Sequence, residues 1–363
     1  MKQSALRTLL SDIIAGHRLS CDEALFLFKI HDRRVWGIAS AADEMREKKA
    51  GDVITWVKNQ NINVTNLCVN ACGFCGFSKK PGDAGIYHHS KKEVQKKTAQ
   101  AEERGVTEIC TVSGLHPDFQ AQSYIDIISW IREKAPHVHI HASNPMEVAY
   151  GAEKSGWSTR EVLQQMKQAG LNSLCGTAAE ILDDQVRDVI CPQKIDTATW
   201  IRIIREAHGL GIPTTATIMY GAYEDDEARV RHLNIIRDIQ DETNGFTEFV
   251  PLSFIHLNTP LFRKGIARSG ATGREDILMY SVSRLFLDNL KNLQVSWVKL
   301  GTKLAQLGLL AGANDLGGTL YEESISKGAG ARNTDYMDPE EMKRLAEDLN
   351  RPFRQRTTLY RLI

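Results

Sequence analysis

From Ile62 onward, short runs of β-branched and other apolar residues alternate with longer stretches whose apolar residues recur at helical spacing. Eight runs have this character, and they lie at residues 62–67, 106–112, 138–142, 172–177, 213–220, 247–255, 294–298 and 309–313. Parallel strands need a long crossover between them, so the alternation predicts a parallel sheet covered by helices. Eight units fit a closed (β/α)8 barrel of the TIM type, and an open doubly wound sheet is the alternative.

Local start signals support the predicted helices. A capping residue stands ahead of an apolar-periodic stretch at Ser20 with Glu23, Ser90 with Glu93, Ser158 with Glu161, Asp196, and Asp338 followed by Pro339. We therefore expect three parts: an N-terminal helical extension at 1–50, the barrel at 51–332, and a C-terminal tail at 333–363 that packs on the barrel.

Composition narrows the class of partner. Lys plus Arg number 45 and Asp plus Glu also number 45, so no excess charge favours nucleic acid or a membrane surface, and small-molecule substrates are expected. No apolar run reaches the length of a membrane span and the first residues lack a secretory core, which predicts a cytoplasmic protein. Four of the seven cysteines, Cys21, Cys110, Cys175 and Cys191, are scattered singly, as expected of buried reduced thiols.

Polar and glycine-rich loops follow several predicted strands. They read S-G-L-H-P at 113–117, H-A-S-N-P at 141–145, G-T-A-A-E at 176–180 and Y-G-A-Y-E at 220–224. Parallel barrels bind ligands at the carboxyl ends of their strands, so these loops are expected to surround one mouth.

The remaining cysteines form a cluster directly after the first predicted strand. Cys68, Cys72 and Cys75 have the spacing C-x3-C-x2-C. Soft thiolates at such short spacing select zinc or an iron–sulfur cluster. In a zinc site His88 or His89 would supply a fourth ligand, whereas a 4Fe–4S cluster held by three cysteines keeps one iron free to bind something else.

The cysteine spacing, with Phe74 before the third cysteine, resembles the signature of the radical S-adenosylmethionine (SAM) enzymes. Further motifs resemble one subgroup of that superfamily, which contains the deazaflavin (FO) synthase enzymes and two menaquinone-pathway synthases. They lie at 81–87, 113–118, 139–148, 176–187, 190–195, 211–221, 245–256 and 313–320. G-T-A-A-E and A-N-D-L-G-G-T-L favour the tyrosine-using component of FO synthase, and this resemblance extends from about residue 50 to the end.

The resemblance implies a 4Fe–4S cluster on Cys68, Cys72 and Cys75, and SAM bound to its open iron. It implies cofactor contacts from Phe74, Ser113, Gly114, Ser143, Glu180 and Arg187. On the residues alone, Glu180 fits a helix capping box with Thr177, and Arg187 fits a solvated helix charge. The resemblance instead makes Arg187 the partner of SAM's carboxylate.

Other polar residues near the strand ends are candidates for substrate contacts. Strand alternation puts His139 and His141 on one face, although a barrel interior is usually apolar. Glu248, Asn314 and Asp315 would need partners if buried, and they are candidates for binding a uracil and its ribityl hydroxyls. The full set is Tyr87, His116, His139, His141, Tyr220, Glu224, Glu248, Asn314 and Asp315.

The function implied by the resemblance is a radical SAM transferase that moves the 4-hydroxybenzyl group of L-tyrosine onto C5 of 5-amino-6-(D-ribitylamino)uracil. It further implies a low-potential electron donor and a partner radical SAM enzyme that closes the deazaflavin ring. Two alternatives are an aminofutalosine synthase-like radical SAM enzyme and a non-catalytic iron–sulfur electron carrier or sensor.

Overall fold

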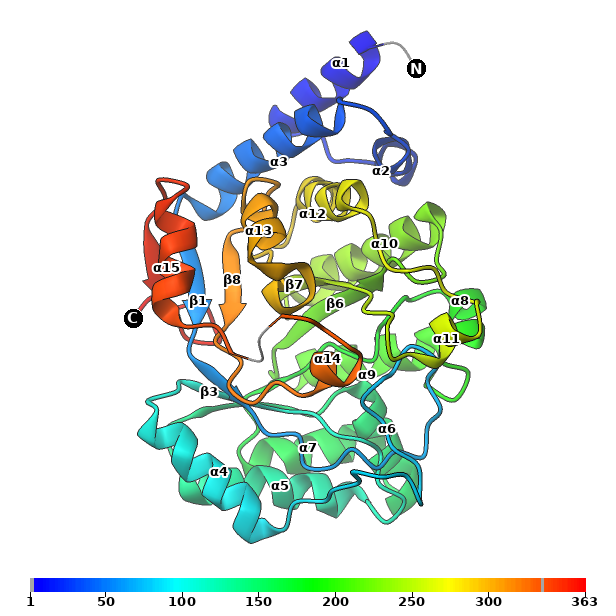
Figure 1. Cartoon of the computed structure of the whole chain (residues 1–363), viewed down its shortest axis with the longest axis vertical. Helices are drawn as coiled ribbons and strands as arrows, with labels where there is room; N and C mark the ends of the chain where they lie inside the picture. The colour runs from blue at the N-terminus through cyan, green and yellow to red at the C-terminus, as the bar shows by residue number, and fades with distance from the viewer. Residues whose placement is uncertain (1–2, 334–335) are drawn as a thin grey trace.

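The computed structural model describes residues 3–333 and 336–363, and Figure 1 shows the whole chain. The strands are β1 (Ile54–Val57), β2 (Asn59–Asn61), β3 (Glu108–Thr111), β4 (His139–Ala142), β5 (Ser173–Leu174), β6 (Thr214–Tyr220), β7 (Phe246–Ser253), β8 (Asp315–Gly318) and β9 (Phe353–Gln355). The helices up to the middle of the barrel are α1 (Gln3–Ile14), α2 (Cys21–Phe28), α3 (Val35–Ala50), α4 (Lys91–Glu103), α5 (Ala121–Lys134), α6 (Pro145–Ser155), α7 (Thr159–Ala169) and α8 (Asp184–Ile190). The others are α9 (Thr197–Gly209), α10 (Asp226–Thr243), α11 (Pro260–Arg263), α12 (Gly273–Phe286), α13 (Trp297–Leu309), α14 (Ile325–Gly328) and α15 (Pro339–Glu347).

The strands close into a parallel barrel, as the alternating pattern predicts. Six strands are paired in the order β2-β3-β4-β5-β6-β7, and a second sheet has the order β8-β1-β9. β1 and β2 are separated by Lys58 alone, so together they join the two sheets. On the other side, Leu293 pairs with Phe249 of β7 and Gln294 pairs with Asp315 of β8. The segment around Leu293 thus occupies the seventh position of an eight-position (β/α)8 barrel.

Three of the eight predicted strands were misplaced. The first lies at 54–61 and not at 62–67, because buried Asn59, Gln60 and Asn61 interrupt its apolar pattern. The run at 294–298 pairs only at its start, since α13 begins at Trp297. The run at 309–313 is the end of α13 and a turn, and β8 follows it. A short apolar run does not distinguish a buried helix end from a strand.

The predicted helix starts agree better with the structure. Complete capping boxes begin α2, α4 and α7, and the carboxylates of Asp196 and Asp338 cap α9 and α15. The capping box expected at Thr177 and Glu180 is wrong, because no helix begins there; α8 starts later, capped by Asp183. Of the four scattered cysteines, Cys175 and Cys191 are buried, Cys110 is half-buried and Cys21 is exposed, which contradicts the expectation for Cys21.

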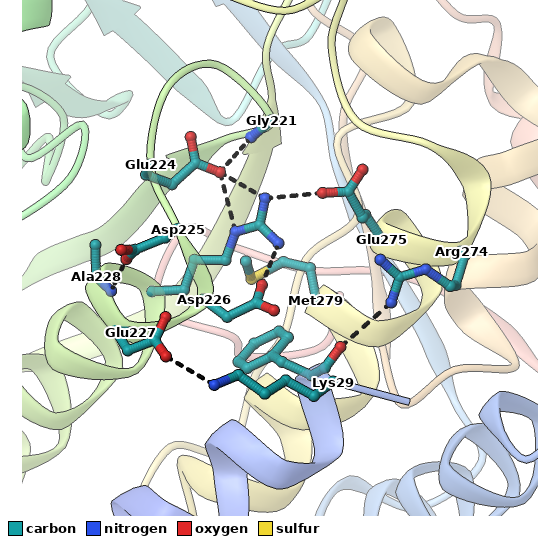
Figure 2. Close-up of polar contacts among 12 residues, drawn as sticks. Lys29, Gly221, Glu224, Asp225, Asp226, Glu227, Ala228, Arg274, Glu275 and Met279 are labelled. Atoms are coloured by element: carbon teal, nitrogen blue, oxygen red, sulfur yellow. Dashed lines mark hydrogen bonds and ion pairs between the residues drawn. The ribbon is translucent and has the colours of Figure 1, made fainter. Parts of the chain in front are cut away.

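The N-terminal helices cover one end of the barrel. α3 packs along α12, and α2 contacts both α10 and α12. Lys29 pairs with Glu227 at 2.8 Å, and Arg274 donates to the carbonyl oxygen of Phe28 at 3.2 Å (Figure 2). These contacts attach the extension to helices that follow β6 and β7.

The C-terminal tail is part of the barrel's structure. β9 pairs in parallel with β1 at Ile54, Thr55 and Trp56, and Trp56 stacks on Phe353. Arg356, which follows β9, is almost completely buried. Across the helices described, none combines the length and apolar character that crossing a bilayer requires.

Candidate functional site

A cavity lies at the carboxyl ends of the strands. Five strand-end segments contribute residues to its wall: 68–78 after β2, 112–115 after β3, 144–147 after β4, 177–180 after β5 and 252–255 at the end of β7. Lys194, Met219, Lys299, Ile325 and Ala329 complete it. This is the edge at which (β/α)8 barrels carry their ligands.

The cysteine loop forms one side of this cavity. Cys68, Cys72 and Cys75 all line it, and all three are free thiols. The ammonium of Lys80 donates to the carbonyl oxygens of Cys68, Val69 and Asn70 at 2.9, 3.0 and 2.6 Å. Lys80 thereby satisfies three backbone acceptors and fixes the path of the loop, a position that the spacing of the cysteines did not reveal.

The same loop is held from its other side. The N–H of Gly73 donates to the carbonyl oxygen of Ile190, and Ala71 N–H donates to Gln193 Oε1 at 2.6 Å. Gly76 has no room for a side chain, because a Cβ there would lie 2.5 Å from the Cα of Ala329. The loop is thus preorganised by backbone packing.

A half-buried ion pair lies beside the cysteines. Lys194 Nζ is 2.5 Å from Glu180 Oε1, and it lies 5.2 Å from the centre of the Phe74 ring. Burial alone would lower the pKa of Lys194, but Glu180 and the thiols of Cys72 and Cys191 raise it above its ordinary value. Burial raises the pKa of Cys72 to about 12, so without a metal this residue is a thiol.

Two polar atoms in the cavity wall lack partners. Glu147 Oε1 accepts from the N–H of Ser113 at 3.1 Å, while Glu147 Oε2 and Thr177 Oγ1 are buried without a hydrogen bond to any described residue. Burial raises the pKa of Glu147 to about 8, although the N–H groups of Ser113 and Asn144 act against that shift. Buried polar atoms without partners are uncommon, and both of these belong to residues that line the cavity.

Strained backbone accompanies these groups. Ser143, Ala178 and Glu180 have φ values of 57°, 65° and 43°, a region that non-glycine residues rarely adopt. Arg187 supports this segment from behind: its guanidinium donates to the carbonyl oxygens of Ala178, Ala179 and Ile181, and to that of Ile195. Such strain persists only where surrounding contacts impose it, and it concentrates at functional sites.

The structure brings some of the predicted cofactor residues together and separates others. Those in the cavity wall are Cys68, Cys72, Cys75, Phe74, Ser113, Gly114 and Glu180. Ser143 and Arg187 lie outside it. The donors of Arg187 are used by backbone carbonyl groups, so the cation beside Glu180 is Lys194 and not Arg187.

The predicted substrate residues do not line this cavity. Glu248 and Asp315 lie deeper in the barrel, where Arg356 contacts both, at 3.4 Å and 2.5 Å. Asn314 Oδ1 accepts from Arg284 at 2.8 Å. Tyr220 is fully buried and donates to Asp276 at 2.7 Å. These side chains already have partners within the fold.

The other candidates also have local partners. His139 Nε2 and His141 Nδ1 each lie 2.7 Å from Ser173 Oγ. Outside the barrel, the Tyr87 ring packs on His89, and the His116 ring packs on His88. Glu224 accepts from the N–H of Gly221 at 2.6 Å and pairs with Arg229, which also bonds Glu275 (Figure 2).

Three cavity residues were missed by the sequence analysis. Lys194 and Glu147 stand within quoted motifs, but their burial depends on contacts distant in sequence. Lys299 directly follows the run predicted as a strand at 294–298, and the structure gives its ammonium a single hydrogen bond among the described residues, to Ser326 Oγ at 3.1 Å. The polar loops identified the correct edge of the barrel without identifying these side chains.

The three cysteines and the polar residues beside them fit the 4Fe–4S cluster that the cysteine spacing predicted. Three thiols on one loop would hold a 4Fe–4S cluster with one position open, and Glu147 and Thr177, whose side chains each have an unpartnered oxygen, line the same cavity. The Glu180–Lys194 pair offers one group of each sign, which suits a ligand that carries both an amine and a carboxylate.

Comparisons with known proteins agree with this architecture. Residues 62–236 match the model of the radical SAM superfamily, and residues 243–357 match the model described as the CofH/MqnC C-terminal region. Among solved structures, methylornithine synthase has a TM-score of 0.72 at 18% identity, with 95% of this chain and 96% of that chain covered. A maturase of FeFe-hydrogenase has a TM-score of 0.76 at 15% identity, with 98% of this chain and 77% of that chain covered. The chain is therefore a radical SAM enzyme with a TIM-type barrel.

Curated relatives define the family within that class. A protein of Methanosphaerula palustris is 72% identical over 98% of this chain and 97% of its own length. A protein of Methanoculleus marisnigri is 67% identical over 99% and 98%, and one of Methanospirillum hungatei is 63% identical over 98% and 97%. All three are named 5-amino-6-(D-ribitylamino)uracil–L-tyrosine 4-hydroxyphenyl transferase. The chain belongs to this family of radical SAM transferases.

Proposed function

We propose that the chain transfers the 4-hydroxybenzyl group of L-tyrosine to C5 of 5-amino-6-(D-ribitylamino)uracil, as a step in deazaflavin (FO) biosynthesis. The observation that carries this proposal is the 72% identity over 98% of the chain to a relative named for these substrates. The cavity supports it independently, because it combines three free thiols with buried polar groups at the mouth of the barrel.

Cys68, Cys72 and Cys75 are proposed to hold a 4Fe–4S cluster, with SAM in the cavity beside it. When bound, the cluster and SAM supply a 5'-deoxyadenosyl radical that abstracts hydrogen from the substrate. The protein's own contribution is binding and orientation. Lys80 fixes the loop that carries the cysteines, and the strained segment at 178–180 holds Glu180 toward the cavity.

The charged groups nearest the cysteines are proposed to bind the methionine part of SAM. Glu180 is placed to pair with its amine and Lys194 with its carboxylate, each at the cost of their present mutual contact. Glu147 and Thr177 would then gain hydrogen-bond partners for their free oxygens. Phe74 contributes an apolar wall that excludes water from this pair.

Lys299 is proposed to bind the carboxylate of the amino-acid substrate. It lines the cavity, and within the described chain no carboxylate lies within ion-pair distance of its ammonium. Burial lowers its pKa, and Glu323 and Glu180 counteract this only through space. A half-buried cation that lines the cavity without a bonded carboxylate favours an anionic ligand group there.

Two partners follow from this chemistry. The cluster would need a low-potential electron donor, and a second radical SAM enzyme would close the deazaflavin ring. We place the reaction in the cytoplasm, where reduced thiols persist, because all seven cysteines are free.

An anaerobic reaction followed by mass spectrometry tests the proposal. Cluster-loaded protein, dithionite, SAM, tyrosine and the diaminouracil are expected to give a hydroxybenzyl adduct of the uracil, and Cys72→Ala is expected to give none. Deoxyadenosine without the adduct would reject the two substrates, and an enolpyruvyl benzoate ether offered in place of tyrosine would then test the aminofutalosine synthase chemistry. If loaded protein gave neither product, it would be an electron carrier or sensor.

A further inference from the structure

A second group of metal-binding side chains lies inside the barrel, apart from the cysteine loop. The ligand atoms of Cys110, His141 and Cys175 all lie within 4.8 Å of one another. None of the three lines the cavity that contains Cys68, Cys72 and Cys75. Neither the family match nor the proposed function gives them a task.

The sheet places these side chains together. Cys110 on β3 is directly paired with His141 on β4, and His141 is paired with Ser173 on β5. Cys175 follows β5 directly. Cys110 and His141 are therefore at one level of the barrel, and Cys175 lies two residues beyond Ser173, the register partner of His141. Because side chains alternate along a strand, residues two apart share a face, which brings the three donors to the same side of the sheet.

The histidine is oriented for a ligand. Its Nδ1 lies 2.7 Å from Ser173 Oγ, which fixes the ring, and in the described part of the chain Nε2 has no hydrogen-bond partner. Metal-bound histidines commonly have their second nitrogen held by such a hydrogen bond.

We propose that Cys110, His141 and Cys175 bind one zinc ion. Two thiolates and a neutral imidazole are a soft ligand set that selects zinc over magnesium or calcium. Binding releases one proton from each thiol and replaces them with the divalent cation, so the buried group stays neutral. His141 and Cys175 are buried, whereas Cys110 is only half-buried and provides a side from which the ion can enter.

The site would strengthen one wall of the cavity. The chain that leaves each of the three strands soon supplies a lining residue: Ser113 after β3, Asn144 after β4 and Thr177 after β5. Three protein ligands leave a fourth position, which water fills in zinc sites of this kind. The inference does not depend on the substrates proposed above, since it concerns the fold beneath the cavity.

Metal analysis of the cluster-loaded protein tests this inference. The enzyme is incubated anaerobically with ZnCl2 and desalted, and its zinc, iron and sulfide are then measured. We expect about one zinc per chain in the wild type and in the exposed-cysteine control Cys21→Ser, with zinc lost from Cys110→Ser and from Cys175→Ser while iron and sulfide stay unchanged. Using two variants keeps the test valid if one of them fails to fold.

X-ray absorption at the zinc edge identifies the ligands without interference from iron. We expect zinc–sulfur distances of about 2.3 Å and zinc–nitrogen distances of about 2.0 Å. Wild-type protein that retains no zinc, or zinc that remains in Cys110→Ser, would overturn the proposal. So would a Cys110–Cys175 disulfide in anaerobically purified enzyme, because oxidised sulfurs cannot act as thiolate ligands.

Discussion

Glu147 is a buried carboxyl in the cavity wall, and its ionisation makes the stability of the fold depend on pH. Its pKa is about 8 in the folded chain and about 4.3 in an unfolded one, so between these values the folded chain binds the extra proton. The contribution of this carboxyl to the free energy of unfolding is therefore fully present below the unfolded pKa, and it is lost as the pH rises through the folded pKa.

We therefore expect the Tm of cluster-free protein to fall between about pH 4.5 and about pH 8, and Glu147→Gln to reduce that fall. Calorimetry at several pH values measures it. Glu153→Gln, on the exposed face of the same helix, serves as the matched control and should keep the wild-type dependence. An unchanged pH dependence in Glu147→Gln would mean that this carboxyl is already ionised.

The two cavity lysines, Lys194 and Lys299, are expected to bind different ligands. A hydrogen bond to a charged group contributes about 1.5–3 kcal/mol, which corresponds to a change of roughly 10- to 100-fold in affinity. Lys194→Met should weaken SAM binding by that factor, and Lys299→Met should weaken tyrosine binding and leave SAM binding unchanged. Equilibrium binding to the cluster-loaded protein measures both, with exposed Lys264→Met as the control. An equal loss of SAM affinity in both variants would refute the assignment of SAM to Lys194 and of tyrosine to Lys299.

The sequence predicted those site residues whose role follows from their neighbours along the chain. The cysteine spacing identified Cys68, Cys72 and Cys75, and the loop after β3 identified Ser113 and Gly114 as lining residues. Side chains whose behaviour depends on distant contacts were not predictable. Arg187 was expected in the cavity, but carbonyl groups from 178–181 and from Ile195 surround it.

Among the elements, strands made of continuous β-branched and apolar residues were located well. β6 is buried at every position, and its run of β-branched and apolar residues predicted it. The first and eighth strands were misplaced, because β1–β2 carries buried Asn59, Gln60 and Asn61 and β8 is the short D-L-G-G. Partners from other elements satisfy these polar groups: Asn59 bonds Glu108 and Leu320. A pattern confined to one strand does not contain that information.

The junction between β5 and β6 should tolerate no side chain at Gly176. A Cβ there would lie 1.8 Å from the carbonyl oxygen of Thr215, so backbone would have to move. We expect Gly176→Ala to lower the free energy of unfolding by on the order of 3 kcal/mol. Gly37→Ala is the matched control: its Cβ meets nothing within 4 Å, and α3 should gain up to about 1 kcal/mol. Denaturant unfolding measures both, and equal stabilities would show that the β5–β6 junction relaxes freely.

In the whole molecule, the C-terminal tail and the barrel form one structure. The tail was expected to pack on the barrel, and it also supplies β9 and the buried cation Arg356. Its guanidinium lies 2.5 Å from Asp315 of β8 and 3.4 Å from Glu248 of β7, and the Tyr360 hydroxyl also bonds Glu248. The carboxylates of β7 and β8 thus depend on the C-terminal tail for charge balance.

Arg356→Met is expected to destabilise the fold strongly. Removing one partner of a buried ion pair costs about 3–5 kcal/mol, because the remaining charge is left without compensation. Burial already raises the pKa of Glu248 to about 7 and Arg356 opposes that shift, so the variant's Glu248 pKa should rise further. Since a raised carboxyl pKa lowers stability as pH increases, the loss should be larger at about pH 8 than at about pH 5.5.

Urea unfolding at the two pH values measures this loss. Arg354→Met is a suitable control, because Arg354 lies two residues away on β9 and is exposed, and among the described residues its side chain bonds only the carbonyl oxygen of Phe353. If Arg356→Met and Arg354→Met were equally stable, the tail would stabilise the barrel only through the pairing of β9 with β1. A loss of stability that is confined to Arg356→Met and grows with pH would instead show that the tail stabilises the barrel by neutralising Asp315 and Glu248. The cavity at the opposite end of the barrel would then be supported by an interior whose buried charges are balanced.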